Sequence, residues 1–200
     1  ILRNNSALKH PTVVIGRDAR ISGQMVTSIV SGTLSGLGIN VIDLELSTTP
    51  TVEMAVTGLK AQGGIILTAS HNPKQWNALK LLNEKGEFIS EAVGQEILKL
   101  AESSDFNYAE VSDLGKYSTN KDFLDIHIQK ILDLPYVDVK AIENAGFSIV
   151  LDAINSSGSI AVPALLKKLG VKKINIIHGE PTGDFAHNPE PLPEHLTDLS

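Results

Sequence analysis

Apolar runs alternate with amphipathic segments in the first 70 residues, and this alternation restricts the possible folds more than any other feature. The last run, Ile65-Ile66-Leu67, has no polar residue, which is typical of a parallel strand covered on both faces. A strand-helix-strand-helix-strand order calls for a parallel sheet with right-handed crossovers. The predicted strands are residues 12–15, 40–44 and 63–67, and the predicted helices are residues 22–37 and 49–59.

Further elements are expected along the rest of the chain. Two apolar stretches that flank Gly86 predict a hairpin. Two more segments with helical spacing are separated by a polar stretch, which we interpret as an exposed connection. The hairpin strands are residues 78–82 and 87–89, the helices begin at Ser90 and Asn120, and the connection is residues 103–119.

The order of elements in residues 148–177 resembles the beginning of the chain. A strand, a helix and a second strand are predicted at residues 148–151, 162–169 and 173–177. We interpret this as a second copy of one β-α-β unit, cut short. The alternative is that any two β-α-β units share this pattern. The predicted fold class is α/β, a mixed and mainly parallel sheet flanked by helices, followed by a partial second copy of a similar unit.

Composition excludes several classes of protein. Hydrophobic residues make up 42% of the chain, enough to bury a core. The absence of cysteine excludes disulfides, thiolate metal sites and thiol catalysis. A net charge of −6 argues against nucleic-acid binding, and no apolar run is long enough to span a bilayer. We therefore expect a cytoplasmic protein without nucleic-acid or membrane partners.

Polar residues follow the third predicted strand directly. Ser70, His71 and Asn72 stand together and are followed by Pro73. In open α/β sheets, ligands bind outside the carboxyl ends of the strands, so these side chains are candidates for chemistry. The alternative is an ordinary turn, because Ser, Asn and Pro are common turn residues. A serine-hydrolase elbow is excluded because the glycines of Gly-x-Ser-x-Gly are missing.

Three basic residues are further candidates. Lys80 interrupts an apolar stretch, where a partly buried amine could act as a general base or could protect an edge strand from aggregation. Arg17 and Arg20 flank Asp18, and their guanidinium groups could bind phosphate or form a structural pair with Asp18. Residues 187–189 repeat the His-Asn-Pro string, which we interpret as part of a rigid linker. Histidine spacing gives no support for a metal site made by protein side chains alone.

Several of these strings together resemble the α-D-phosphohexomutases, the family that includes phosphoglucomutase, phosphomannomutase and phosphoglucosamine mutase. The resemblance runs over nearly the whole chain. Ala78 replaces the glycine usual in the family between Asn77 and the apolar residue before Lys80, and the string 74–80 is most similar to bacterial phosphoglucosamine mutases. The matching strings are Thr68-Ala69-Ser70-His71-Asn72-Pro73, Gly16-Arg17-Asp18, Thr49-Pro50, Asn77-Ala78-Leu79-Lys80 and His187-Asn188-Pro189-Glu190-Pro191.

The resemblance implies a role for each candidate residue. Ser70 would be the phosphoserine that exchanges a phosphoryl group with a hexose phosphate through a hexose 1,6-bisphosphate, and its phosphate would be one ligand of Mg²⁺. Lys80 would be the general base, His71 the neighbouring acid/base residue, and Arg17 a phosphate-binding residue. The expected reaction moves a phosphoryl group between C6 and C1, with glucosamine 6-phosphate as the first candidate. The alternatives are glucose or mannose phosphates, or a non-catalytic sugar-phosphate-binding module.

The resemblance also implies a division into domains. Residues 1–138 would be domain 1 without its N-terminal loop and strand, and residues 139–200 part of domain 2. The family's aspartate-rich metal loop does not occur in the sequence. We therefore expect a fragment whose other metal ligands and sugar contacts lie on missing domains, and which does not complete catalysis alone.

Overall fold

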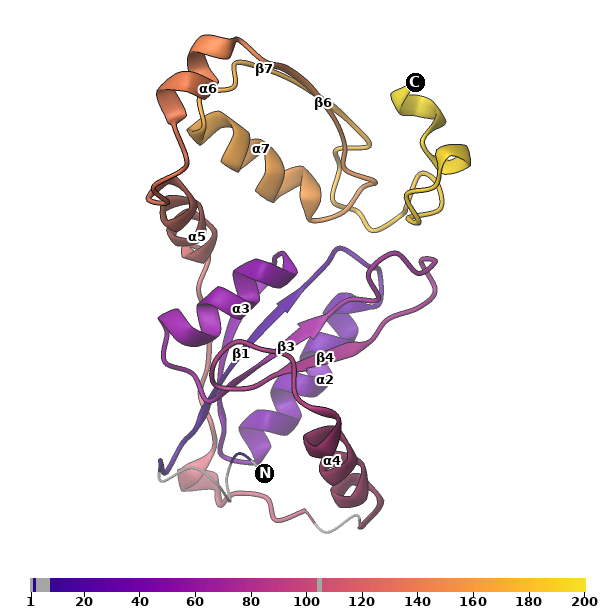
Figure 1. Cartoon of the computed structure of the whole chain (residues 1–200). Coiled ribbons are helices and arrows are strands. Elements are labelled where there is room, and N and C mark those ends of the chain that lie inside the picture. Colours follow the sequence, from indigo (N-terminus) through magenta and orange to yellow (C-terminus); the bar gives the residue numbers. More distant parts are fainter. Residues whose placement is uncertain (1, 3–7, 104–105) are drawn as a thin grey trace.

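The computed structural model describes residues 2, 8–103 and 106–200, and it contains two α/β units, one above the other in Figure 1. The first unit is built around a five-stranded sheet and the second around a two-stranded parallel sheet. The first contains β1 (Thr12–Arg17), α2 (Gly23–Gly36), β2 (Asn40–Leu46), α3 (Thr49–Gly58), β3 (Gly63–Leu67), β4 (Leu79–Leu82), α4 (Glu91–Ser103) and β5 (Tyr117–Thr119). The remainder contains α5 (Phe123–Leu132), α6 (Val139–Ala145), β6 (Ser148–Asp152), α7 (Gly158–Lys168) and β7 (Lys173–Ile177), with 3₁₀ turns at Val111–Asp113, Pro193–His195 and Thr197–Leu199.

The five-stranded sheet has the order β4-β3-β1-β2-β5 and is mainly parallel, which confirms the predicted fold class. β1 pairs in parallel with both β2 and β3, and β4 runs antiparallel to β3. The predicted hairpin is shorter than expected. After the turn at Gly86, a single antiparallel bridge between Phe88 and Leu82 takes the place of the second strand. The carboxyl ends of β1 and β3 therefore meet at one edge of the sheet.

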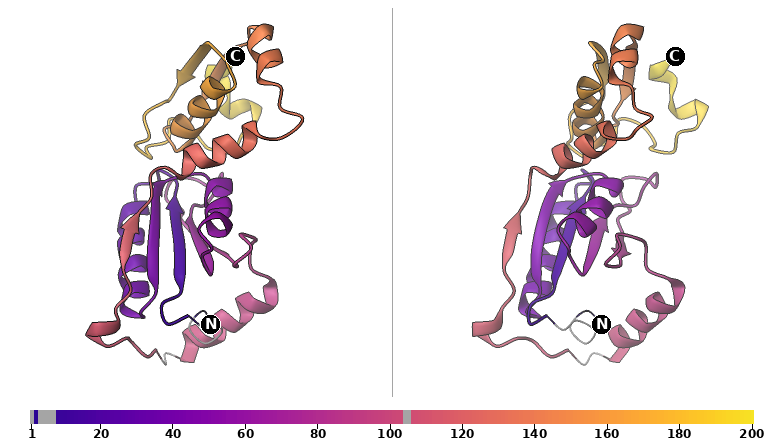
Figure 2. Two further views of the ribbon diagram at one scale, coloured as in Figure 1. Left: turned by 90° about the vertical axis from the view of Figure 1, so that its left-hand side faces the viewer. Right: turned by 60° about the vertical axis from the view of Figure 1, so that its left-hand side comes forward.

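Helices cover both faces of this sheet, as the turned views in Figure 2 show. On one face α3 packs Val52 and Val56 against Val14 and Ile66. On the other, Val13 and Ile15 pack against apolar side chains of α2. Because both faces are buried, the central strands need apolar residues at every position, which explains their sequence. Among the described residues no helix is long and apolar enough to span a membrane.

α5 lies between the two units. Buried Phe123 packs into the core beneath α3, and the half-buried His127 ring contacts Thr51 of α3, with 2.9 Å between Nδ1 and Oγ1. α5 also contacts α7 of the second unit. The second unit is a parallel β6-α7-β7 arrangement, the same kind of unit as β1-α2-β2. This similarity is consistent with an internal repeat. It is equally consistent with the alternative that any two β-α-β units share the same order of elements.

Several element boundaries differ from the predictions. β1 continues through Arg17, which pairs with Leu67 and so belongs to the strand instead of the loop after it. α5 begins at Phe123, three residues after the expected cap. The sequence analysis missed α6, whose first turn is capped by the Asp138 side chain at 2.9 Å from the Ala141 amide. It also missed β5, which lies within the predicted exposed connection.

β5 attaches to β2 through backbone pairing and through one side chain. The Tyr117 hydroxyl donates to Asp43 Oδ2 at 2.7 Å, and Asp43 is buried. Burial and this hydrogen bond raise the pKa of the Tyr117 phenol to about 12. The strand is only three residues long, too short for its periodicity to be distinguished from a loop.

The Tyr117 hydrogen bond leads to a pH-dependent prediction. Because the folded pKa is raised, the stabilisation is complete below about pH 10 and is lost as the pH rises through about 12. We expect Tyr117→Phe to lower the free energy of unfolding by about 1 kcal/mol at pH 8 and by less at pH 11. Urea unfolding at both pH values measures this, with exposed Tyr136→Phe as control. An equal loss in both variants, or a pH-independent difference, would contradict it.

Candidate active site

Ser70 lies just beyond the carboxyl end of β3, where the sheet opens to solvent. Thr68 and Ala69 are buried, whereas Ser70 is exposed. Its backbone adopts a left-handed conformation with φ of 54°, which is uncommon for a residue other than glycine. The Thr68 hydroxyl accepts a hydrogen bond from the Ser70 amide at 3.0 Å. This local turn leaves the Ser70 side chain exposed at the carboxyl end of β3.

The buried side chain of Arg20 holds the loop at residues 68–76, which carries Ser70 and which we call the serine loop. Its guanidinium group is fully enclosed and makes a salt bridge to Asp18, with 3.1 Å between Nε and Oδ2. The same carboxylate accepts from the Thr68 hydroxyl at 2.7 Å. Both Nη atoms donate to backbone carbonyls of the loop at 2.8–2.9 Å, and these carbonyls belong to Ser70, Asn72, Pro73 and Trp76. Arg20 therefore has a structural role, because it has no donor left for a ligand.

Arg17 differs from Arg20 although both flank Asp18 in the sequence. Its guanidinium group donates to the Gln24 side chain at 2.9 Å and to the backbone carbonyl of Asp18 at 3.4 Å. Within the part of the chain that the structure describes, Arg17 has no acidic partner. Its positive charge at the end of β1 is therefore available to an anionic ligand.

Lys80 lies on β4, opposite Ile66 of the strand that leads to Ser70. The Thr68 amide donates to the carbonyl of Ala78 at 3.1 Å, which ties the start of the serine loop to the residue before β4. The Lys80 side chain is partly buried, and no ion pair to it occurs across residues 8–103 and 106–200. β3 and β4 thus place Ser70 and Lys80 at one end of the sheet.

His71 and Lys74 connect the serine loop to the second unit. Nδ1 of His71 is 3.5 Å from the Ser70 hydroxyl, and its Nε2 is 3.2 Å from Glu190. Lys74 pairs with Asp184 at 2.8 Å and lowers the pKa of that exposed carboxyl. Residues 184–190 therefore lie against the serine loop instead of forming a separate linker.

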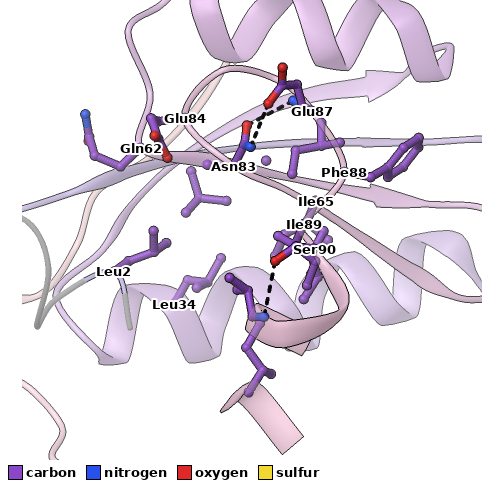
Figure 3. A pocket seen from close by; sticks show the side chains of 17 residues that line it. Leu2, Leu34, Gln62, Ile65, Asn83, Glu84, Glu87, Phe88, Ile89 and Ser90 are labelled. Carbon is purple, nitrogen blue, oxygen red and sulfur yellow. Dashed lines mark hydrogen bonds between the residues drawn. The ribbon is translucent and has the colours of Figure 1, made fainter. Parts of the chain in front are cut away.

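A separate pocket lies elsewhere on the first unit. It forms between the sheet and the start of α4, and Figure 3 shows apolar side chains of Leu2, Leu34 and Ile65 facing it, with Asn83 and Glu87 on its rim. None of the four predicted site residues lines it. The hollow is therefore separate from the serine loop.

A cluster at the ends of β6 and β7 contains donor atoms that could hold a metal ion. Asp152 ends β6, His178 follows β7, and His187 reaches back from the segment beside the serine loop. Their ligand atoms all lie within 4.8 Å of one another. The sequence analysis missed this cluster because it considered histidine spacing alone; the useful signal was an acidic and an imidazole group at the carboxyl ends of neighbouring parallel strands.

Hydrogen bonds within this cluster set the direction in which the pKa values of Asp152 and His187 are shifted. Burial raises the pKa of the Asp152 carboxyl, but hydrogen bonds from His187, the Ile154 amide and His178 outweigh burial and leave the pKa lowered. Burial lowers the pKa of His187, but its contacts with the Asn188 carbonyl and Asp152 leave it raised. Two imidazoles and one carboxylate are a poor match for Mg²⁺, which prefers oxygen ligands, so the cluster does not fit the expected Mg²⁺ site.

The mainly parallel α/β sheet with a serine loop at its carboxyl end can be compared with known proteins. Residues 1–108 match the sequence model of phosphoglucomutase/phosphomannomutase α/β/α domain I. Residues 125–200 match that of α/β/α domain II. The chain belongs to the phosphoglucomutase/phosphomannomutase family.

Individual relatives cover nearly all of the chain. A phosphoglucomutase/phosphomannomutase of Thermococcus kodakarensis is 37% identical over 94% of the chain and 41% of the relative. A phosphoglucosamine/phosphogalactosamine mutase of Sulfurisphaera tokodaii is 32% identical over 96% of the chain and 42% of the relative. The crystal structure of a phosphoglucomutase/phosphomannomutase family protein from Burkholderia thailandensis matches with a TM-score of 0.75 and 25% identity, over 94% of the chain and 41% of that protein. The chain thus spans about two fifths of the length of these relatives.

Proposed function

We propose that this chain carries the phosphoryl-transfer centre of a phosphohexomutase and that Ser70 is its phosphorylated residue. The observation that carries the proposal is the buried Arg20 side chain, which holds the loop through its backbone carbonyls (the Arg20 clamp) while Ser70, in a left-handed backbone conformation, stays exposed at the carboxyl end of β3. Cationic side chains at the same sheet end support it, because a phosphoserine has a charge of about −1.5 to −2. Family membership gives the reaction class.

The proposed step moves a phosphoryl group from Ser70 to a free hydroxyl of a hexose phosphate. The bond between phosphorus and Ser70 Oγ breaks, a bond to the sugar oxygen forms, and Lys80 takes the hydroxyl proton. The product is a hexose 1,6-bisphosphate. Return of its other phosphoryl group to Ser70 completes the exchange between C6 and C1. Arg17 binds the phosphate, and His71 orients the phosphoserine or donates the proton that Ser70 Oγ takes up when its bond to phosphorus breaks.

Mg²⁺ is the proposed cofactor. A phosphate oxygen on Ser70 would be its ligand from this chain, and we expect the other ligands in the part of the family that the chain does not cover. When bound, Mg²⁺ would neutralise charge on the transferring group. The described residues near Ser70 supply no group of three metal-ligating side chains.

We propose glucosamine 6-phosphate as the first substrate to test, because several relatives are named phosphoglucosamine mutases, among them those of Methanopyrus kandleri and Methanosphaera stadtmanae. Glucose and mannose phosphates are the alternatives, supported by the Thermococcus relative. We further propose that the boundary between domains 1 and 2 falls near residue 138. These 200 residues alone would not complete the mutase reaction. We also propose that the protein acts in the cytoplasm on a small sugar phosphate.

Loading of Ser70 tests the proposed function. We expect the full-length protein, incubated with a hexose 1,6-bisphosphate, to gain the mass of one phosphoryl group on the peptide containing Ser70. A module that only binds sugar phosphates would retain the ligand without covalent labelling. Phosphopeptide mapping separates the two, and an unmodified Ser70 in a protein that turns over substrate would contradict the proposal.

A further inference from the structure

Asp152, His178 and His187 are joined by short contacts between their side chains. Asp152 Oδ2 is 2.8 Å from His187 Nε2, and Oδ1 is 3.1 Å from His178 Nδ1. Only 5% of the Asp152 side chain is exposed, and each histidine side chain is about four fifths covered. The three groups face one another away from bulk solvent.

Each imidazole in the cluster has an acceptor oxygen at both ring nitrogens. His187 Nδ1 lies 2.8 Å from the Asn188 carbonyl, opposite the nitrogen that faces Asp152. His178 Nε2 lies 3.2 Å from the Asp198 carboxylate, also opposite its Asp152 contact. A neutral imidazole has only one N–H, so it can satisfy only one of its two acceptors. A cation bound by Asp152 and by the two ring nitrogens that face it, His178 Nδ1 and His187 Nε2, would satisfy all of these groups. The opposite ring nitrogens would then carry the protons and donate them to Asp198 and to the Asn188 carbonyl.

This arrangement has the features of a zinc site. Zn²⁺ accepts two imidazole nitrogens and one carboxylate oxygen, with a fourth position left for water. Histidine ligands usually donate the other ring N–H to a carboxylate or a backbone carbonyl, as Asp198 and Asn188 allow here. With bonds of about 2.0–2.1 Å, neighbouring ligand atoms of tetrahedral zinc are about 3.3 Å apart. The two nitrogen–oxygen distances in the cluster, 2.8 and 3.1 Å, are shorter and run to different oxygens of Asp152, so the imidazoles and the carboxylate would separate slightly around an ion.

We propose that Asp152, His178 and His187 bind Zn²⁺ at a site separate from the Mg²⁺ expected at the phosphoserine. The ion would join the ends of β6 and β7 to the segment at residues 187–190. Glu190 of that segment contacts His71, next to Ser70. A bound ion would therefore help to hold this segment beside the serine loop. The proposal does not depend on mutase activity.

Zinc binding by the purified full-length protein tests this proposal. After equilibrium dialysis and elemental analysis, we expect one Zn²⁺ per chain, and Co²⁺ should give the visible absorption bands of a tetrahedral nitrogen-oxygen site. His178→Gln and His187→Gln should each weaken binding at least 100-fold. Asp198→Asn should weaken it by about 10–100-fold through the outer hydrogen bond.

His195→Gln is the matched control, because His195 belongs to the same C-terminal segment but its ring is hydrogen-bonded to the Glu190 carbonyl and is not part of the cluster. It should bind zinc like the unchanged chain. Far-UV circular dichroism shows whether each variant remains folded. Absence of binding at 100 µM Zn²⁺, or equal binding by the folded His187→Gln and His195→Gln variants, would overturn the proposal and leave the cluster as a hydrogen-bonded network without a metal ion.

Discussion

Arg20→Met is expected to lower the free energy of unfolding by about 3–5 kcal/mol. The substitution removes one partner of a buried ion pair and leaves Asp18 without its counter-ion. It also leaves four carbonyls of the serine loop without their donors. Because the clamp fixes the loop, phosphorylation of Ser70 should be lost in any fraction that still folds. Urea unfolding followed by circular dichroism measures the first effect, and phosphopeptide mapping the second.

Arg17→Met is the matched control for this experiment. Arg17 stands three residues earlier and has the same side chain, whose hydrogen bonds within the described residues go to Gln24 and to the Asp18 carbonyl. We expect its removal to change the free energy of unfolding by less than about 1 kcal/mol and to raise KM for the sugar phosphate. Equal destabilisation by the two substitutions would show that the clamp is not the element that fixes the loop.

Ser70→Ala is expected to have the largest effect on activity. We expect kcat of the full-length protein to fall by roughly 10³-fold or more, as removal of a covalent nucleophile does. Stability should change little, because the hydroxyl is exposed and the loop is held through the backbone amide and carbonyl of residue 70. A coupled mutase assay measures kcat.

Ser28→Ala provides the comparison for Ser70→Ala. Ser28 is an exposed serine of α2 whose hydroxyl donates to the Gln24 carbonyl. It should leave kcat unchanged. Full mutase activity in Ser70→Ala would exclude a phosphoserine at this position, even if sugar phosphate still binds.

The central fold could be predicted because the physical signal was strong. Buried parallel strands require apolar residues on both faces, and β1 and β3 show them plainly. β5 and α6 could not be predicted in the same way. β5 has three exposed residues and depends on Tyr117 reaching Asp43, 74 positions away, which no local pattern records. α6 has only seven residues and buries none of them.

The candidate site was only partly predictable for a related reason. Ser70, His71 and Asn72 could be named as candidates because they directly follow a buried strand, and only the family resemblance singled out Ser70. The sequence could not separate Arg17 from Arg20, since the difference depends on which side chain extends beneath the loop at residues 70–76. The Asp152 cluster joins groups 26 and 35 positions apart, so spacing along the chain carried no signal.

A pulse-chase of the phosphoryl group on Ser70 tests the proposed chemistry most directly. The full-length protein is first loaded with labelled phosphate from a hexose 1,6-bisphosphate and freed of ligand, and unlabelled hexose phosphate is then added. We predict that the label leaves Ser70 and is recovered in hexose bisphosphate and hexose monophosphate, at the rate of turnover. Label that remains on Ser70 while the protein converts substrate, or that is released only as inorganic phosphate, would contradict the assignment of Ser70 as the phosphoryl donor.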